Sequence, residues 1–181
     1  CQPHASSGMK GVIIAHHPPV FGCTDSTAFN YDSTATVDDG SCIYYTNELF
    51  ISEYSDGSGY NNYIEIYNGT GVPIDLSQYQ VWEVLNGGTW TEKTLNLTGM
   101  LAHNDVYVIH HSTSSVSPLI TSAGNLAWIF ASWTGNDAVG LAKNGTLIDA
   151  VGEDGLDPGN GWNVAGVIDA TQSHTLVRKC F

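Results

Sequence analysis

A chain of 181 residues is long enough for one domain with a small appendage and too short for two full-sized domains. A hydrophobic share of 42% allows a sizeable core and excludes a chain that is disordered throughout. The formal net charge is −13 and only five residues are lysine or arginine, so direct binding of nucleic acid is disfavoured and Ca²⁺ is the cofactor to expect.

Residues 1–22 are interpreted as a lead or linker, in which only a short apolar strand at residues 12–15 is expected. This run is far shorter than the roughly 18 to 20 residues that a membrane-spanning helix needs, and no other run approaches that length. The sequence begins at Cys1 rather than Met, which indicates a processed product or a fragment; a lipid-bearing first cysteine is the alternative.

Four cysteines are present, and none has the Cys-x-x-Cys spacing typical of zinc or thiol-redox sites. We therefore expect disulfides. Cys23 and Cys42 bracket a polar segment too poor in apolar residues to fold alone, and a bridge between them would stabilise it through the unfolded state. Such a bridge implies an oxidising, extracytoplasmic compartment. Cys1 and Cys180 either pair within the chain or cross-link two copies.

Residues 23–42 are predicted to form an acidic loop module that is closed by this disulfide. Ca²⁺ takes about six to eight hard oxygen ligands and tolerates irregular geometry. The candidate ligands in the module are Asp25, Asn30, Asp32, Asp38 and Asp39. Their spacing is not that of an EF-hand, and the alternative is that they serve turns. A second, weaker metal candidate, also at expected turn positions, comprises Asp149, Glu153, Asp154 and Asp157.

Residues 43–181 are predicted to form an all-β domain, because their hydrophobic periodicity is two rather than 3.6. The expected strands lie at residues 63–67, 81–84, 106–109 and 147–151. Asn144-Gly145 lies between two apolar runs, which predicts a hairpin over residues 138–151. Short strands separated by turns, 20 glycines and no convincing amphipathic helix indicate an antiparallel sandwich.

Catalytic motifs are lacking in the sequence: there is no nucleophile elbow, phosphate loop or His-Glu-x-x-His pattern, so we expect no enzyme. His110-His111 are adjacent, and neighbouring residues of a strand point to opposite faces, which disfavours one metal ion between them. Asn68, Asn96 and Asn144 stand in glycosylation sequons but are interpreted as turn residues. Trp90 and Trp133 are flanked by Gly, Thr or Ser and are candidate surface platforms for glycans, core packing being the alternative.

The order of several blocks between residues 47 and 180 resembles that of bacterial lamin-tail domains. The blocks are residues 49–54, 61–68, 72–79, 135–141, 148–152, 157–159, Trp162 and 175–179. The resemblance implies an immunoglobulin-like β-sandwich without a catalytic residue set. Residues 22–42 resemble the Gly-Cys-Thr-Asp to Asp-Asp-Gly-Ser-Cys module of large secreted proteins from Bacteroidetes-type bacteria, which implies an exported parent protein.

The function expected from these features is non-catalytic binding or assembly, structural or adhesive, in a secreted or cell-surface bacterial protein. The expected partners are proteins, further copies of the chain, or glycans, with no direct nucleic-acid contact. The alternative is an accessory domain that targets substrate to an extracellular nuclease or phosphatase. Free strand edges of a sandwich invite strand addition, which is the physical basis for expecting self-association.

Overall fold

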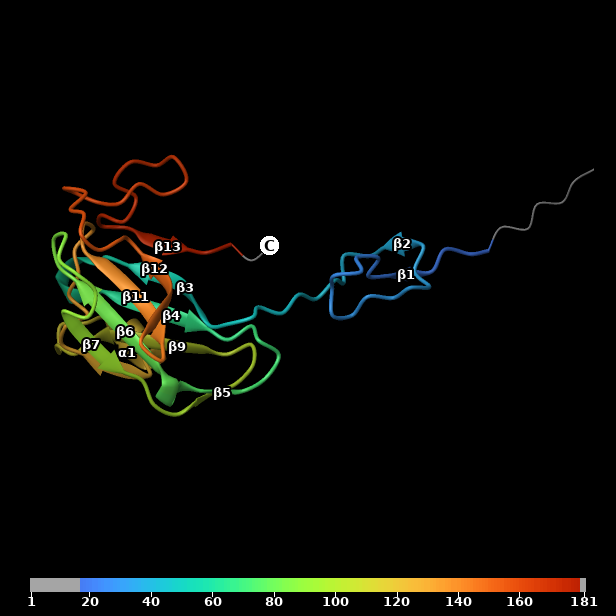
Figure 1. Ribbon diagram of the computed structural model, residues 1–181, viewed down its shortest axis with the longest axis horizontal. Helices are drawn as coiled ribbons and strands as arrows, with labels where there is room; N and C mark the ends of the chain where they lie inside the picture. The colour runs from blue at the N-terminus through green and yellow to red at the C-terminus, as the bar shows by residue number, and fades with distance from the viewer. Residues whose placement is uncertain (1–16, 180–181) are drawn as a thin grey trace, which may run out of the picture. The chain divides into compact units, whose positions relative to one another are not determined.

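The computed structural model describes residues 17–179, which divide into two compact units between Tyr45 and Thr46 (Figure 1). Residues 43–45, which the sequence pattern placed in the sandwich, belong to the smaller unit, which ends at Tyr45. The backbone N–H of Phe29 donates to the carbonyl of Ile43 at 2.8 Å, and the ring of Phe29 packs on that of Tyr45 with centroids 4.6 Å apart.

The predicted strand at residues 12–15 lies outside the described residues, as do Cys1 and Cys180. Their pairing therefore stays a prediction.

The smaller unit is held together by covalent and turn chemistry rather than by a core. Its two short strands, β1 (Phe21–Gly22) and β2 (Val37–Asp38), pair in parallel. The predicted disulfide between Cys23 and Cys42 is present. Cys23 and Ala28 are its buried hydrophobic residues among those described, so the bridge replaces the apolar core that so short a segment cannot build.

The larger unit is a sandwich of two sheets. The first has the strand order β10-β9-β4-β3-β13 and the second has the order β12-β11-β6-β7. The strands of the first sheet are β3 (Phe50–Ser55), β4 (Tyr63–Tyr67), β9 (Val106–His111), β10 (Leu126–Trp128) and β13 (Thr175–Val177). Those of the second are β6 (Tyr79–Val84), β7 (Lys93–Asn96), β11 (Ala138–Lys143) and β12 (Thr146–Val151).

Smaller elements connect the strands of the sandwich. They are the strand pair β5 (Ile74–Asp75) and β8 (Met100–Leu101), the 3₁₀ turns η2 (Ser58–Tyr60) and η3 (Leu76–Gln78), and the short helix α1 (Pro118–Ala123). All strand pairs of the sandwich are antiparallel apart from β9 and β10 within the described residues. The immunoglobulin-like all-β prediction is confirmed; the parallel pair and the one-and-a-half-turn helix were not predicted.

The predicted hairpin is formed by β11 and β12, with Asn144 and Gly145 at its turn. Both residues have positive φ angles, 49° and 75°, which is the backbone that a two-residue turn between twisted strands requires. The turn interpretation of Asn68 is also supported, because its Oδ1 accepts the backbone N–H of Thr70, two residues on. The turn interpretation of Asn96 is wrong, because Asn96 is the last residue of β7 and pairs with Gln80 of β6.

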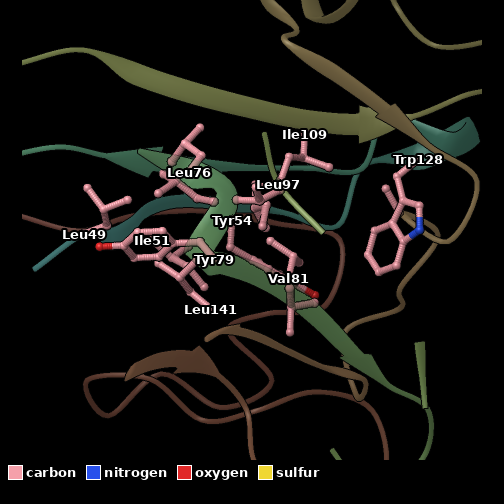
Figure 2. Packing of buried hydrophobic residues seen from close by; sticks show 14 of the residues in the cluster. Leu49, Ile51, Tyr54, Leu76, Tyr79, Val81, Leu97, Ile109, Trp128 and Leu141 are labelled. Carbon is pink, nitrogen blue, oxygen red and sulfur yellow. The ribbon is translucent and has the colours of Figure 1, made fainter. Parts of the chain in front are cut away.

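The main core lies between the two sheets and is formed by side chains from both of them (Figure 2). It includes Ile51 and Tyr54 of β3, Ile109 of β9, and Tyr79 and Val81 of β6, all less than 4% exposed. A second, smaller cluster contains Val84, Ala138 and Trp162, with Trp90 packed against it. In β6 the burial of Tyr79 and Val81 follows the period of two that predicted this strand. In β3 the core residues Ile51 and Tyr54 lie three positions apart across a register shift, and periodicity did not predict this strand.

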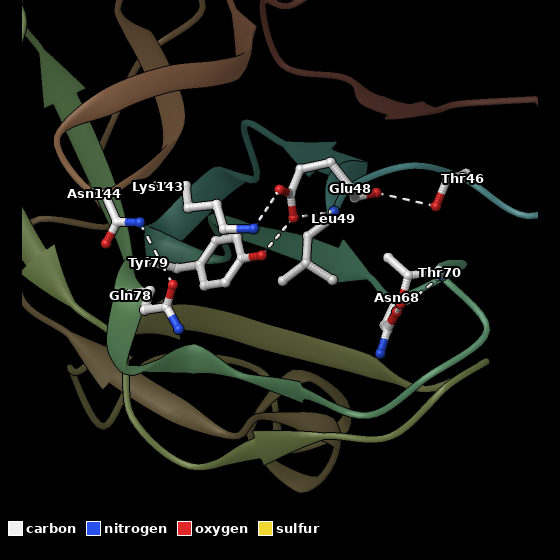
Figure 3. Close-up of polar contacts among 9 residues, drawn as sticks. All are labelled: Thr46, Glu48, Leu49, Asn68, Thr70, Gln78, Tyr79, Lys143 and Asn144. Carbon is white, nitrogen blue, oxygen red and sulfur yellow. Dashed lines mark hydrogen bonds and ion pairs between the residues drawn. The ribbon is translucent and has the colours of Figure 1, made fainter.

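A polar hub joins the start of β3 to the second sheet (Figure 3). The carboxylate of Glu48 accepts hydrogen bonds from the hydroxyl of Tyr79 and the backbone N–H of Leu49, and it pairs with the ammonium of Lys143 at 2.7 Å. Partial burial raises the pKa of Glu48, but the hydrogen bonds from Lys143 and Tyr79 outweigh it and hold the pKa below its ordinary value.

The variant Lys143→Met is expected to lower the free energy of unfolding by about 1 kcal/mol at pH 7, because the pair is only partly buried. The loss should vanish at a pH below the lowered pKa of Glu48, where protonation of the carboxyl removes the ion pair in the wild-type protein too. Urea unfolding at both pH values, with Lys179→Met as the exposed control, measures this difference. An equal loss at both pH values would contradict an electrostatic origin.

Candidate functional site

A groove of about 400 Å³ lies at the open side of the sandwich, where both sheets end. Its walls are residues 51–54 of β3, residues 150–153 at the end of β12, residues 162–164 and residues 176–178 around β13. Both β12 and β13 are terminal strands of their sheets. Because Val151 and Leu176 pack against the main core, the floor of the groove is continuous with that core.

The carboxylate of Asp149 in β12 holds the two sheets together beside this groove. Oδ2 accepts the backbone N–H of Ile51 in β3 at 2.8 Å, next to an irregularity in the register of β3 and β4. The guanidinium of Arg178, just after β13, contacts both oxygens of Asp149 at 2.8 and 2.9 Å. The backbone N–H of Arg178 donates to the carbonyl of Ser52, which continues the pairing beyond β13.

Trp162 forms one end of the groove, and three hydrogen bonds fix its position. Its indole N–H donates to the carbonyl of Asp137 at 3.1 Å, and its backbone N–H donates to the hydroxyl of Thr171 at 2.7 Å. Thr171 in turn donates to the carbonyl of Gly135. A β-carbon on Gly152 would lie 2.5 Å from the indole nitrogen, and Gly152 has a φ of 82°, so this close approach requires glycine.

Apolar side chains stand exposed along the rim of the groove. Val164 lines it, and Val167 faces Val164 across a pair of backbone hydrogen bonds. The exposed fractions are 58% for Val167, 76% for the neighbouring Ile168 and 63% for Val177 of β13. Exposed apolar residues that gather beside a concave surface are typical of an interaction site.

A comparison with protein-family models finds a match to the Lamin Tail Domain over residues 44–155, which is more than half of the chain. The chain belongs to the lamin tail domain family. No curated protein matches the chain. The matched residues include β3 to β12, whereas Trp162, the apolar rim and β13 follow the matched part of this lamin tail domain. Within residues 17–179, no helix has the length and apolar character needed to cross a membrane.

The groove of the lamin tail domain has an acidic wall. Glu53 and Glu153 both line it, while the charge of Arg178, the cation in the lining, is balanced by Asp149. Glu53 accepts the hydroxyl of Tyr63 at 2.9 Å; burial, together with this hydrogen bond, raises the pKa of Tyr63 to about 12. The groove therefore presents net negative charge between apolar surfaces.

Glu83 is a buried carboxyl in β6, in phase with Tyr79 and Val81, whose side chains belong to the core. It is 1% exposed, and its Oε1 has no hydrogen-bond partner among residues 17–179. Burial, reinforced by the nearby carboxylate of Asp137, raises the pKa of Glu83 to about 8. The hydroxyl of Tyr54 is likewise buried and unpartnered within that range.

Glu83 binds its proton more tightly in the folded than in the unfolded state, where its pKa is near 4.5. The wild-type protein should therefore lose stability as pH rises from about 5 to 8, by roughly 3 kcal/mol. In Glu83→Gln this slope should be absent, and the variant should exceed the wild type in stability at pH 8. Urea unfolding across this range, followed by tryptophan fluorescence, measures the slope. Parallel curves for the two proteins would contradict the buried-acid interpretation.

The five candidate calcium ligands occupy turns of the smaller unit. Asp25 and Asp32 each accept the backbone N–H and the hydroxyl of the threonine two residues on. Asp38 and Asp39 accept backbone N–H groups of Gly40 and Ser41, and Asn30 bonds the backbone of Ser41 and Ile43. Hydrogen bonds to Thr27 and Tyr44 lower the pKa of Asp25. Each of these contacts supports the turn alternative.

No group of three or more His, Cys, Asp or Glu residues with the geometry of a metal site exists in the described part of the chain. The second acidic stretch is dispersed: Asp149 serves the contact between the sheets, Asp154 accepts the backbone N–H of Trp90 at 3.4 Å, and Asp157 accepts that of Gly159. Calcium binding by either stretch stays a prediction.

The prediction that Trp133 is a surface platform is wrong. Trp133 is 1% exposed, its indole N–H donates to the carbonyl of Ser55 at 2.9 Å, and its ring stacks on Tyr54. Its polar neighbours in sequence occupy turns while the ring itself fills the core. Trp90 is half-buried and lies against Trp82, with ring centroids 6.3 Å apart, and its role as a platform stays a prediction.

His110 and His111 do not act as a ligand pair in this structure. Nδ1 of His110 contacts the carbonyl of His111 at 2.7 Å, and Nδ1 of His111 accepts the backbone N–H of Thr113. The ring of His111 stacks on Tyr60. Both side chains are buried in the end of β9, and the lowered pKa of His111, caused by burial, favours its neutral form.

Sequence reasoning missed the groove and the roles of two carboxylates. Asp149 was noted only as a weak metal candidate, since its partner Ile51 lies 98 residues away. Glu83 was not singled out, although its position in Val81-Trp82-Glu83-Val84, two residues after a core valine, is a signal for a buried acid.

Proposed function

We propose that this lamin tail domain is a non-catalytic binding and assembly module of a secreted or cell-surface bacterial protein. The observation that carries the proposal is the groove at the open side of the sandwich. It combines a floor continuous with the core, two terminal strands and an exposed apolar rim. A concave site on a rigid sandwich suits recognition of another protein, because the binding surface needs little ordering when a partner arrives.

The extracellular location rests on the Cys23–Cys42 disulfide, which is compatible with an oxidising compartment. The resemblance of this unit to modules of Bacteroidetes-type secreted proteins supports the same location. In this proposal the smaller unit acts as a spacer or as a second binding surface for a partner. The Cys23–Cys42 disulfide and the turns at its Asp residues hold it compact.

Calcium stays part of the proposal as a ligand of the smaller unit. Isothermal titration of the full chain with CaCl₂ tests it, with Asp25→Asn and Asp39→Asn as variants. A one-to-one heat that either substitution removes would support calcium binding. A titration without heat would contradict it and leave Asp25, Asn30, Asp32, Asp38 and Asp39 as turn residues.

Light scattering of the full chain under non-reducing conditions, with calcium and with a chelator, tests the assembly role. Multimers are expected if strand edges or disulfides join copies, and their dependence on calcium or reductant identifies the link. A monomer under all conditions would contradict assembly and leave recognition of a different partner.

The alternative function is substrate targeting for an extracellular nuclease or phosphatase. The −13 net charge weighs against contact with phosphates unless a metal ion bridges them. Incubation of the full chain with plasmid, with and without Mg²⁺ or Ca²⁺, distinguishes the functions. Cleavage would contradict the non-catalytic proposal, and a salt-sensitive mobility shift would favour the targeting alternative.

A further inference from the structure

We propose that the groove binds an extended, positively charged peptide segment of a partner protein, in which apolar and basic residues alternate. This inference rests on the proposed function and names the partner class of the same site. Four features of the described residues carry it: the shape of the groove, the free edge of β13, the apolar rim and the acidic wall.

An extended conformation follows from the strands beside the groove. β13 pairs only with β3 and so presents an unpaired edge among the described residues. β12 pairs only with β11, but its outer edge is engaged at Asp149, which accepts the N–H of Ala150 and of Ile51 and binds Arg178. A peptide that lies along such an edge satisfies rows of backbone N–H and C=O groups, and its side chains alternate between the groove and solvent.

Alternating apolar residues in the peptide match the floor and the rim. Val151 and Leu176 leave part of their surface in the groove while packing against the core, and Val164 continues this surface toward Val167. Burial of the exposed rim by a partner removes apolar surface from water, which supplies binding free energy without a rearrangement of the sandwich.

Positive charge in the peptide follows from the acidic wall. Glu53 of β3 and Glu153, two residues after the end of β12, line the groove, and Arg178 is already neutralised by Asp149. A second copy of the chain would bring a net charge of −13 to this wall, so repulsion disfavours it as the occupant. Basic side chains at the peptide positions that come closest to Glu53 and Glu153 would complement these carboxylates.

The test uses the full chain and a blocked peptide of sequence Lys-Val-Lys-Val-Lys-Val, with Glu-Val-Glu-Val-Glu-Val as the charge control. We expect the basic peptide alone to bind, with amide shifts in NMR spectra at residues 150–153, 162–168 and 176–178. Affinity should fall as salt rises. N-methylation of alternate peptide nitrogens should abolish binding, since it removes the strand hydrogen bonds.

Surface variants assign the binding to the groove. Glu153→Gln should weaken binding of the basic peptide about threefold, and Val167→Ser with Ile168→Ser about fivefold. The matched controls are Asp105→Asn and Leu119→Ser, which change exposed residues away from the groove and should leave affinity unchanged. Equal effects of variants and controls, or equal binding of both peptides, would overturn the proposal.

Two results separate this inference from the proposed function. Self-association of the chain, without peptide binding in the groove, would overturn the peptide inference and support the assembly role. Plasmid cleavage by the chain would overturn the non-catalytic proposal, whereas specific peptide binding at residues 150–153 would still support the inference.

Discussion

The carboxylate of Asp149 joins the two sheets on the side of the sandwich where neither sheet has a further strand. It accepts the N–H of Ile51 from the opposite sheet and binds Arg178 through both oxygens. Just before the same end of β3, Glu48 makes a second link between the sheets, to Tyr79 and Lys143. Both polar links therefore lie near the start of β3, and the groove lies beside the first of them.

The residues that complete the groove lie beyond the part of the chain that matches the family. Trp162 is placed by hydrogen bonds to Asp137 and Thr171, and it can pack closely because Gly152 has no β-carbon. The family-matched part therefore supplies Val151 and the β3 side of the groove, while the segment after residue 155 supplies Leu176, one end and the apolar rim. This division of roles is common, since binding sites vary in loops that a rigid framework positions.

β4, β6, β9, the β11–β12 hairpin and the Cys23–Cys42 bridge could be predicted because each depends on a local pattern: alternation, an Asn-Gly turn and paired cysteines around a polar segment. Periodicity did not predict β3, β7, β10 or β13. The groove could not be predicted, because it depends on the contact between Asp149 and Ile51, which lie 98 residues apart in the sequence. The prediction for Trp133 failed for a related reason. The small polar residues beside it in the sequence indicate a turn, but they do not show whether the Trp133 ring reaches the core. The resemblance to lamin-tail domains predicted the fold but did not predict a ligand.

Amide hydrogen exchange at Ile51 tests most directly whether Asp149 holds the open side together. In the wild-type protein the Ile51 amide should be strongly protected, because it donates to the Asp149 carboxylate. In Asp149→Ala, protection of Ile51 should fall by about tenfold or more while that of Ile64, in the interior of β4, changes far less. Equal protection of Ile51 in both proteins would contradict the account, since the amide would then owe its protection to another partner.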